Sequence, residues 1–332
     1  MFRHELIKSN LNLENSCKSG FQTINPEEII SFGGSSGWGY HNNLYVFNVK
    51  TCLWKLIETS GDPPSPRSGV STDIYKENFV YFFGGFDRRV YFDDFFKLDI
   101  TTWTWESLPQ KPQGRHSHSG NIHEDNYYIF GGRFDHDGTR DNILWKYSIK
   151  QEKWEQVEPL GKKPISRSSH IGMIFQDALY IYGGAGPINE ALRDLHFYSI
   201  FDNTWNEIIV PEAEIPPPLI ASSAVKCGSR LILVGGKILE DKKRTDLNTV
   251  FQYDFIQNNW SELSPWSDET LFPKRSSHVC ALADYKIVLF GGEVLKNEFY
   301  FKHLNDVWIL HLIQDLPKDL LEFSKQNLLF DI

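Results

Sequence analysis

The sequence predicts an all-β protein made of six copies of one four-stranded unit. Six Gly-Gly doublets recur at intervals of 47 to 56 residues, and each ends a short run of β-branched and aromatic residues, which is typical of a strand. A fixed period of this length indicates a repeat architecture, and the repeats fill the chain from about residue 17 to residue 312, so one large domain is expected. The doublets begin at Gly33, Gly84, Gly131, Gly183, Gly235 and Gly291.

The second unit shows the expected strands in order. Small residues at 68–72 form the first strand, and the apolar run 78–83 leads to the doublet. Residues 94–99 and 105–108 form the third and fourth strands, and turn residues separate all four. Because an isolated four-stranded sheet cannot bury both faces, the units are expected to form a closed ring of sheets, which leaves only short protected edges.

Three further positions repeat along the chain. Five units carry a tryptophan after the doublet: Trp54, Trp105, Trp154, Trp205 and Trp260. Four of these follow an aromatic residue at a constant spacing, namely Phe47, Tyr147, Tyr198 and Tyr253, whereas the second unit has Leu98. Arginine opens the first strand in four units, at Arg67, Arg115, Arg167 and Arg275, and an acidic or amide residue opens the third strand.

This combination resembles the kelch repeat over most of the chain. The resemblance implies a six-bladed kelch β-propeller with four antiparallel strands per blade, assigned here to residues 1–316. Such rings close by taking one strand from the opposite terminus. Because residues 5–9 resemble residues 55–59 of the first unit's fourth strand, residues 2–8 are expected to complete the last blade, with Leu320-Leu321 as the alternative. The tail, residues 317–332, has helix-like apolar spacing.

The composition argues against several classes of protein. The formal net charge is −9, with 34 basic against 43 acidic residues, which argues against broad binding of nucleic acid or anionic membrane. No apolar stretch is long enough to span a membrane. The four cysteines, Cys17, Cys52, Cys227 and Cys280, are far apart, and the chain opens without a signal-peptide pattern. A cytoplasmic location is expected, with the nucleus as an alternative.

No strong catalytic or cofactor motif is present. The GxSxG match at residues 33–37 uses the repeat's own doublet, and no helical pattern follows it. HExxH and paired CxxC spacings are absent, so no metal and no cofactor is expected, although a metal site assembled across blades stays open. Plant specifier proteins with similar repeats hold iron through Glu-xxx-Asp-xxx-His, and the nearest match here, Glu190, Asp194 and Tyr198, lacks the histidine.

Two sets of residues are candidates for partner binding. The resemblance implies that Arg67, Arg115, Arg167 and Arg275 surround the channel mouth, where kelch substrate receptors bind acidic peptides; the alternative is that they only tie the blades together. Guanidinium groups suit carboxylates and phosphates. The loops after the doublets add aromatic and basic residues of the types that dominate binding hot spots: Trp38, Tyr40, Arg88, Arg89, Tyr91, Arg133, Phe134, Phe299 and Tyr300.

We therefore predict a non-enzymatic scaffold or adaptor that binds a protein partner through one face of the propeller. An acidic or phosphorylated peptide is the expected ligand class. The resemblance implies a ubiquitin-ligase component, a cytoskeletal protein or a small GTPase as partner classes. The acidic net charge leads us to expect no nucleic acid as a partner. The alternative is an enzyme or a metal-dependent specifier-like protein with a site in the central channel.

Overall fold

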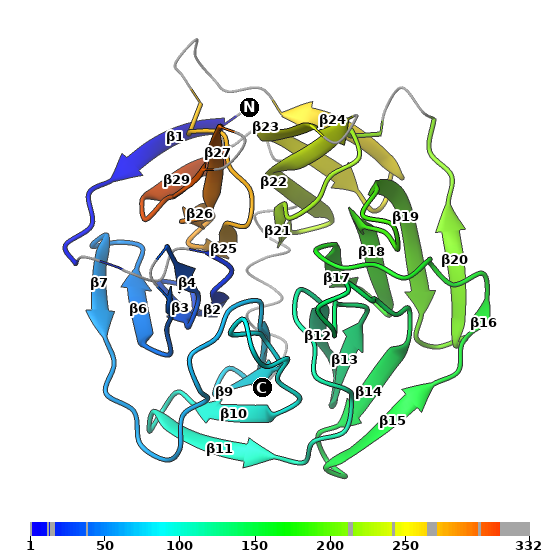
Figure 1. Cartoon of the computed structure of the whole chain (residues 1–332), viewed down its shortest axis with the longest axis horizontal. Helices are drawn as coiled ribbons and strands as arrows, with labels where there is room; N and C mark the ends of the chain where they lie inside the picture. Colours follow the sequence, from blue (N-terminus) through cyan, green and yellow to red (C-terminus); the bar gives the residue numbers. More distant parts are fainter. Residues whose placement is uncertain are drawn as a thin grey trace.

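Six small β-sheets form a closed ring in the computed structural model (Figure 1). The structure describes residues 2–11, 13, 17–37, 39–211, 215–240, 243–263, 271–297 and 300–312. Each sheet is one blade of four antiparallel strands, and the fourth blade gains one short parallel strand. The predicted six-bladed propeller is confirmed. No helix in the described ranges is long and apolar enough to cross a membrane.

The strands follow one another from the centre of the ring outward in each blade. Blade 1 contains β2 (Gly20–Asn25), β3 (Glu28–Phe32), β6 (Leu44–Asn48) and β7 (Leu53–Leu56). Blade 2 contains β8 (Ser71–Tyr75), β9 (Phe79–Phe83), β10 (Phe95–Asp99) and β11 (Thr104–Leu108). Blade 3 contains β12 (Ser119–His123), β13 (Asn126–Phe130), β14 (Leu144–Ser148) and β15 (Lys153–Val157).

The second half of the ring repeats this order. Blade 4 contains β17 (Ile171–Phe175), β18 (Ala178–Ala185), β19 (Ala191–Ser199) and β20 (Thr204–Ile208), with β16 (Leu160–Gly161) parallel to β20. Blade 5 contains β21 (Ser223–Cys227), β22 (Arg230–Glu240), β23 (Lys243–Asp254) and β24 (Asn259–Leu263). Blade 6 contains β25 (Val279–Ala283), β26 (Lys286–Phe290), β29 (Val307–Leu312) and β1 (Phe2–Ile7). Two hairpins, β4 (Ser35–Ser36) with β5 (Gly39–Tyr40) and β27 (Glu293–Asn297) with β28 (Tyr300–His303), lie outside the blades.

The repeated tryptophans join neighbouring blades. Four of the five lie directly across from an aromatic residue on the third strand, as Trp154 does from Tyr147, with ring centroids 5.1 Å apart, whereas Trp105 lies across from Leu98. Each also contacts the residue directly before the Gly-Gly doublet of the preceding blade, as Trp154 contacts Phe83 with ring centroids 5.5 Å apart. The same contact recurs for Trp54, Trp105, Trp205 and Trp260, with Phe290, Phe32, Phe130 and Tyr182 respectively. The tryptophan therefore fills the space between two sheets, which explains why an outer strand keeps so large an apolar residue.

The N-terminal strand closes the ring. β1 pairs antiparallel with β29 over six residues, from Phe2 opposite Leu312 to Ile7 opposite Val307. The side chain of Ile7 is buried in a core that includes Val307 and Val49 of blade 1. The predicted closure by residues 2–8 is confirmed. Leu320-Leu321, the tail and the boundary at residue 316 lie outside the described residues.

The second glycine of each doublet approaches the start of an inner strand, and Gly184 tests how much the fold depends on this contact. Its φ is 95°, and a Cβ there would lie 2.7 Å from the carbonyl oxygen of Ser168 and 2.8 Å from Cβ of His170. We expect Gly184→Ala to lower the free energy of unfolding by about 2–3 kcal/mol, because it adds both backbone strain and overlap. Gly39→Ala is the matched control, since a Cβ at Gly39 has no atom within 4 Å. Chemical denaturation measures both, and equal effects would contradict this explanation.

Candidate functional site

The four repeated arginines are buried before the inner strands of their own blades and bond groups on the neighbouring strands. Each is at most 1% exposed, and its Nη1 donates to the carbonyl oxygen of the first doublet glycine. Each also pairs with an aspartate near the start of the third strand; Arg167 donates to both oxygens of Asp194 at 2.8 and 2.7 Å. The pairs are Arg67–Asp94, Arg115–Asp141, Arg167–Asp194 and Arg275–Asp306.

This geometry corrects the predicted position of these arginines at the channel mouth. Their guanidinium groups are occupied within the blades, and none of the four lines the central channel. Their backbones also bond the preceding blade, since the amide of Gly132 donates to the carbonyl of Arg167 at 2.8 Å. Each arginine therefore links strands within its blade and links two blades to each other.

A continuous ring of backbone hydrogen bonds encircles the channel mouth instead. One residue from each blade lies just before its inner strand, with φ between 51° and 70°. The amide of each donates to the carbonyl of the residue before it in the ring, at 2.7–3.1 Å, and the sixth bond returns to the first residue. This mouth ring consists of Lys18, Gly69, Ser117, Ser169, Ala221 and Ser277. Below it lies a channel of about 1020 Å³ lined by the inner strands of all six blades.

A basic cluster includes Lys18 of the mouth ring and three side chains near it. It consists of Lys18, Arg133, Arg140 and Lys237, and the structure gives none of the four an ion pair with a carboxylate among the described residues. Burial, followed by the charges of Arg244 and Lys18, lowers the pKa of Lys237 to about 8. Burial and then the charge of Arg133 lower the pKa of Arg140. Cations crowded in this way favour an anionic ligand, which would relieve their mutual repulsion.

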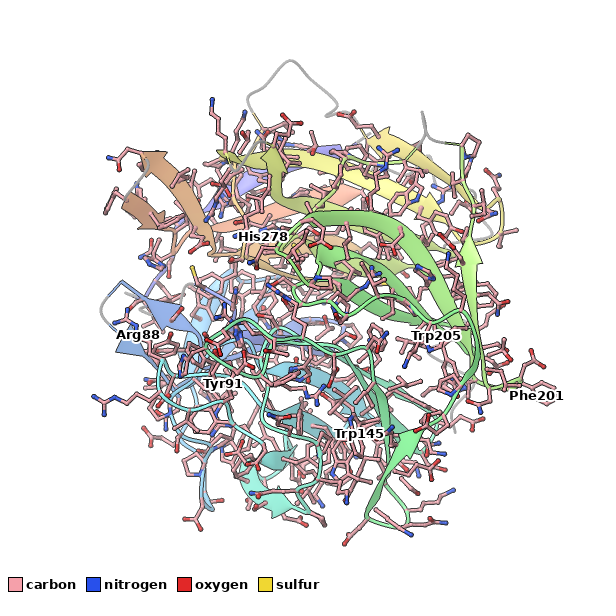
Figure 2. All side chains as sticks on the ribbon, turned by 45° about the vertical axis from the view of Figure 1, so that its right-hand side comes forward. Arg88, Tyr91, Trp145, Phe201, Trp205 and His278 are labelled. Atoms are coloured by element: carbon pink, nitrogen blue, oxygen red, sulfur yellow. The ribbon has the colours of Figure 1, made fainter. Side chains whose placement is uncertain are left out.

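An aromatic cluster lies beside the basic one. It consists of Tyr40, Phe86, Tyr91, His116 and His136. The rings of Phe86 and Tyr91 are 4.6 Å apart, and His116 stacks on Phe86 at 5.0 Å. The guanidinium of Arg88 lies 6.0 Å above the Tyr40 ring. In Figure 2, Arg88 and Tyr91 lie on one side of the ring and Phe201 projects from the opposite edge.

His116 connects the two clusters. Its Nδ1 lies 2.9 Å from Oγ of Ser117 in the mouth ring, and its ring stacks on Phe86. Burial, and then the charges of Lys18, Arg133 and Arg140, lower its pKa to about 3. His116 is therefore neutral near pH 7 and acts as part of the aromatic surface, while the basic cluster supplies the positive charge.

The sequence matches the KLHDC2/KLHL20/DRC7 Kelch-repeats domain over residues 14–132 and 117–316. The chain belongs to the kelch-repeat family. It is similar to human Kelch domain-containing protein 3, with 29% identity over 63% of this chain and 58% of that protein. It is also similar to the leucine-zipper-like transcriptional regulator 1 homolog of Drosophila melanogaster, with 26% identity over 81% of this chain and 28% of that protein.

A third relative, the host cell factor homolog hcf-1 of Caenorhabditis elegans, is 24% identical over 89% of this chain and 43% of that protein. The matched region therefore spans less than two thirds of the length of these relatives. The family match agrees with the propeller fold. The similarity to these kelch proteins and to the host cell factor homolog supports a protein-interaction role for this chain.

The kelch propeller brings several predicted binding residues together. Tyr40, Arg88 and Tyr91 meet in or beside the aromatic cluster, and Arg133 belongs to the basic cluster. Phe134 is half-buried after Arg133, and Arg89 is exposed. Tyr300 is exposed on β28, part of the hairpin that extends from blade 6. Trp38 and Phe299 lie outside the described residues.

Three members of the basic cluster were not predicted. Lys18 lies just before the first inner strand, Lys237 directly follows a doublet, and Arg140 comes late in the same loop as Arg133. Arg133 and Lys237 occupy one repeat position that otherwise holds Ser35, Phe86, Ala185 and Glu293. The changing residue type at a regular position of the kelch repeat is the signal that could have found them.

Two residues of the specifier-like match, Asp194 and Tyr198, bond to different groups in the structure and do not form a common metal site. Asp194 pairs with Arg167 and with Nε2 of His196 at 2.8 Å, whereas Tyr198 donates to Asn203. Within the channel, burial raises the pKa of Asp73 to about 6, and the backbone amides of Ile122 and Ile74 donate to its carboxylate. Burial lowers the pKa of Lys226, which also lines the channel.

Proposed function

We propose that this kelch propeller binds an acidic segment of a partner protein at the channel mouth. The observation that carries the proposal is the basic cluster Lys18, Arg133, Arg140 and Lys237, whose members form no direct ion pair with a carboxylate among the described residues. The whole chain carries a net charge of −9, so this positive site is a local exception in an acidic protein. A local field of this kind attracts and orients an anionic partner.

The aromatic cluster supplies the apolar half of the proposed site. Tyr40 and Tyr91 present rigid rings next to the basic cluster, and both are only partly buried. Aromatic anchors beside arginine are the residue types that contribute most to binding energy in protein interfaces. A peptide with acidic residues next to an apolar one would fit both clusters. Because the mouth ring and its neighbours are bonded around the whole circle, the site is formed before the partner arrives, which lowers the entropy cost of binding.

Selection from a library of random displayed peptides tests this proposal. Wild-type protein is expected to enrich peptides rich in aspartate and glutamate. The triple variant Arg133→Ala/Arg140→Ala/Lys237→Ala should not, provided that its melting curve matches the wild type. The control Lys146→Ala/Lys153→Ala/Lys162→Ala removes the same charge from outer strands and a distant loop, and it should select like the wild type. Selected peptides without an acidic bias would overturn the proposed ligand class.

The finer assignments are also proposals. A role as an adaptor or scaffold, with a ubiquitin-ligase component, a cytoskeletal protein or a small GTPase as partner, is supported by the resemblance to kelch proteins. The same holds for a non-enzymatic role. A cytoplasmic or nuclear location is supported by the four cysteines, none of which forms a disulfide among the described residues: Cys17, Cys52, Cys227 and Cys280.

A further inference from the structure

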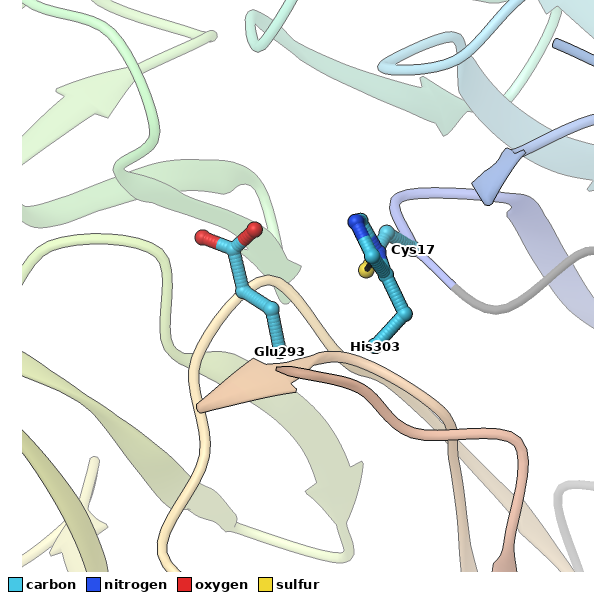
Figure 3. Close-up of side chains that lie close together, drawn as sticks. All are labelled: Cys17, Glu293 and His303. Atoms are coloured by element: carbon cyan, nitrogen blue, oxygen red, sulfur yellow. Dashed lines mark hydrogen bonds between the residues drawn. The ribbon is translucent and has the colours of Figure 1, made fainter. Parts of the chain in front are cut away.

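Three metal-ligating side chains meet where the last blade joins the first. Sγ of Cys17 lies 3.1 Å from Nδ1 of His303, and a carboxylate oxygen of Glu293 completes the group (Figure 3). All three ligand atoms lie within 4.8 Å of one another. Cys17 and His303 are 286 residues apart in the sequence, so no local spacing predicts the group.

The backbone explains why these side chains converge. Glu293 and His303 are direct partners across the β27–β28 hairpin, so their side chains share one face. Cys17 is held opposite by two backbone hydrogen bonds with Ser35, at 3.1 and 2.9 Å. The next residue, Lys18, donates its amide to Ser277 of blade 6 at 3.0 Å. Both sides of the group are therefore anchored, and their separation is set by the closed ring.

The donor set is typical of zinc. Thiolate, imidazole and carboxylate are the three ligand types that Zn²⁺ uses, at about 2.0–2.3 Å from the ion. Atoms at those distances around a tetrahedral ion lie roughly 3.5 Å apart, so small side-chain rotations from the present positions are sufficient. A Cys ligand disfavours Mg²⁺ and Ca²⁺, which prefer oxygen donors.

The surroundings of Glu293 are compatible with such a site. Oε1 of Glu293 lies 3.1 Å from Nη1 of Arg244 and accepts from Oγ of Ser277 at 3.4 Å. Arg244 is itself paired with Asp246 at 2.8 Å, which offsets its charge. A carboxylate has two oxygens, so Glu293 can keep these contacts through Oε1 and offer Oε2 to an ion, with its orientation fixed by Arg244.

We propose that Cys17, Glu293 and His303 bind one Zn²⁺ ion, with water as the fourth ligand, at the junction of blades 6 and 1. The thiol of Cys17 gives up its proton to solvent when the ion binds. The ion links the segment before the first inner strand to the last blade, so it adds a second closure of the ring beside the β1–β29 pairing. Binding to the folded chain alone must raise its stability. This inference does not depend on the proposed peptide site.

Titration of the chelator-treated 332-residue chain with zinc chloride in a calorimeter, and with cobalt(II) in a spectrophotometer, tests the site. We expect one equivalent of zinc, a thiolate-to-cobalt charge-transfer band, and a higher melting temperature with zinc. Cys17→Ala and His303→Ala should each weaken zinc binding at least about 100-fold and remove the cobalt band. Cys52→Ala, which removes a thiol outside the group, should bind like the wild type.

Melting curves of the metal-free wild type and variants show whether a variant that binds no zinc is still folded. If Cys17→Ala fails to fold, His303→Gln on the β27–β28 hairpin gives the same test. Wild-type protein that binds no stoichiometric zinc, or variants that bind as tightly as the wild type, would overturn the site.

Discussion

Arg275→Ala is expected to lower the free energy of unfolding by about 3–5 kcal/mol, because removing one partner of a buried ion pair leaves the other charge unpaired. Arg275 is fully buried and donates to both oxygens of Asp306, at 2.7 and 2.8 Å, and to the carbonyl of Gly291 at 2.9 Å. Its loss therefore leaves the Asp306 carboxylate without its countercharge, with the indole N–H of Trp308 as a remaining donor at 2.8 Å, and removes the side-chain donor to the carbonyl of Gly291. Urea denaturation followed by tryptophan fluorescence measures the change.

Two further variants show whether the unpaired aspartate causes the loss. Arg88→Ala removes an exposed arginine and should cost less than about 1 kcal/mol. Arg275→Ala/Asp306→Ala should cost less than the sum of its single substitutions, since neither charge is then left alone. A single variant as stable as the wild type would contradict the assignment of these arginines as links within and between blades.

The pH dependence gives an independent check of the same pair. Burial raises the pKa of Asp306, but the hydrogen bond and charge of Arg275 outweigh it and hold the pKa below its ordinary value. A carboxyl group with a lowered pKa in the folded state stabilises the protein above about pH 4 and loses this contribution as the pH falls through the lowered pKa. The difference between the wild type and Arg275→Ala should therefore shrink in acid.

Deleting residues 1–10 is expected to produce the largest loss of stability. The deletion removes β1, all six residue pairs with β29, and the buried side chain of Ile7. It also leaves β29 as an exposed edge strand, which promotes aggregation. We expect a melting temperature lower by more than about 10 °C, or no cooperative transition, because several kcal/mol of burial and pairing are lost together.

Point substitutions in β1 distinguish ring closure from a general effect of shortening the chain. Ile7 is 8% exposed and its neighbour Leu6 is 57% exposed, so the two face opposite sides of the strand. Ile7→Ala should cost about 2–5 kcal/mol and Leu6→Ala less than about 1 kcal/mol. Equal effects, or unchanged melting after the deletion, would show that β1 does not close the ring.

The architecture could be predicted from the sequence because the same pattern of strand and turn residues occurs in six successive units. The doublets, the tryptophans and the resemblance of residues 5–9 to a fourth strand led to six blades and N-terminal closure. The burial of the arginines could also have been predicted. The units that open with arginine carry an aspartate near the third strand, whereas Asn43 and Thr249 stand there in the two units without it. Such pairing of opposite charges indicates an internal ion pair rather than a ligand site.

The two candidate sites at the channel mouth were harder to predict. The basic cluster combines Lys18 of blade 1, Arg133 and Arg140 of blade 3 and Lys237 of blade 5, which only the closed ring brings together. The Cys17, Glu293 and His303 group likewise depends on the junction between blades 6 and 1. The changing residue after each doublet marks single candidates such as Arg133 and Lys237, but local spacing does not show that the members of either site meet, because they come from repeats that are distant in the sequence.

The most direct test of the account is the affinity of a selected acidic peptide for three proteins at matched ionic strength. These are the wild type, Arg133→Ala/Arg140→Ala/Lys237→Ala, and the outer control Lys146→Ala/Lys153→Ala/Lys162→Ala. Because a charge-assisted hydrogen bond contributes about 1.5–3 kcal/mol, the mouth variant should bind at least about tenfold more weakly at a temperature where its melting curve shows it to be fully folded. The outer control should bind like the wild type. Equal affinity of all three proteins would show that the basic cluster is not the recognition site.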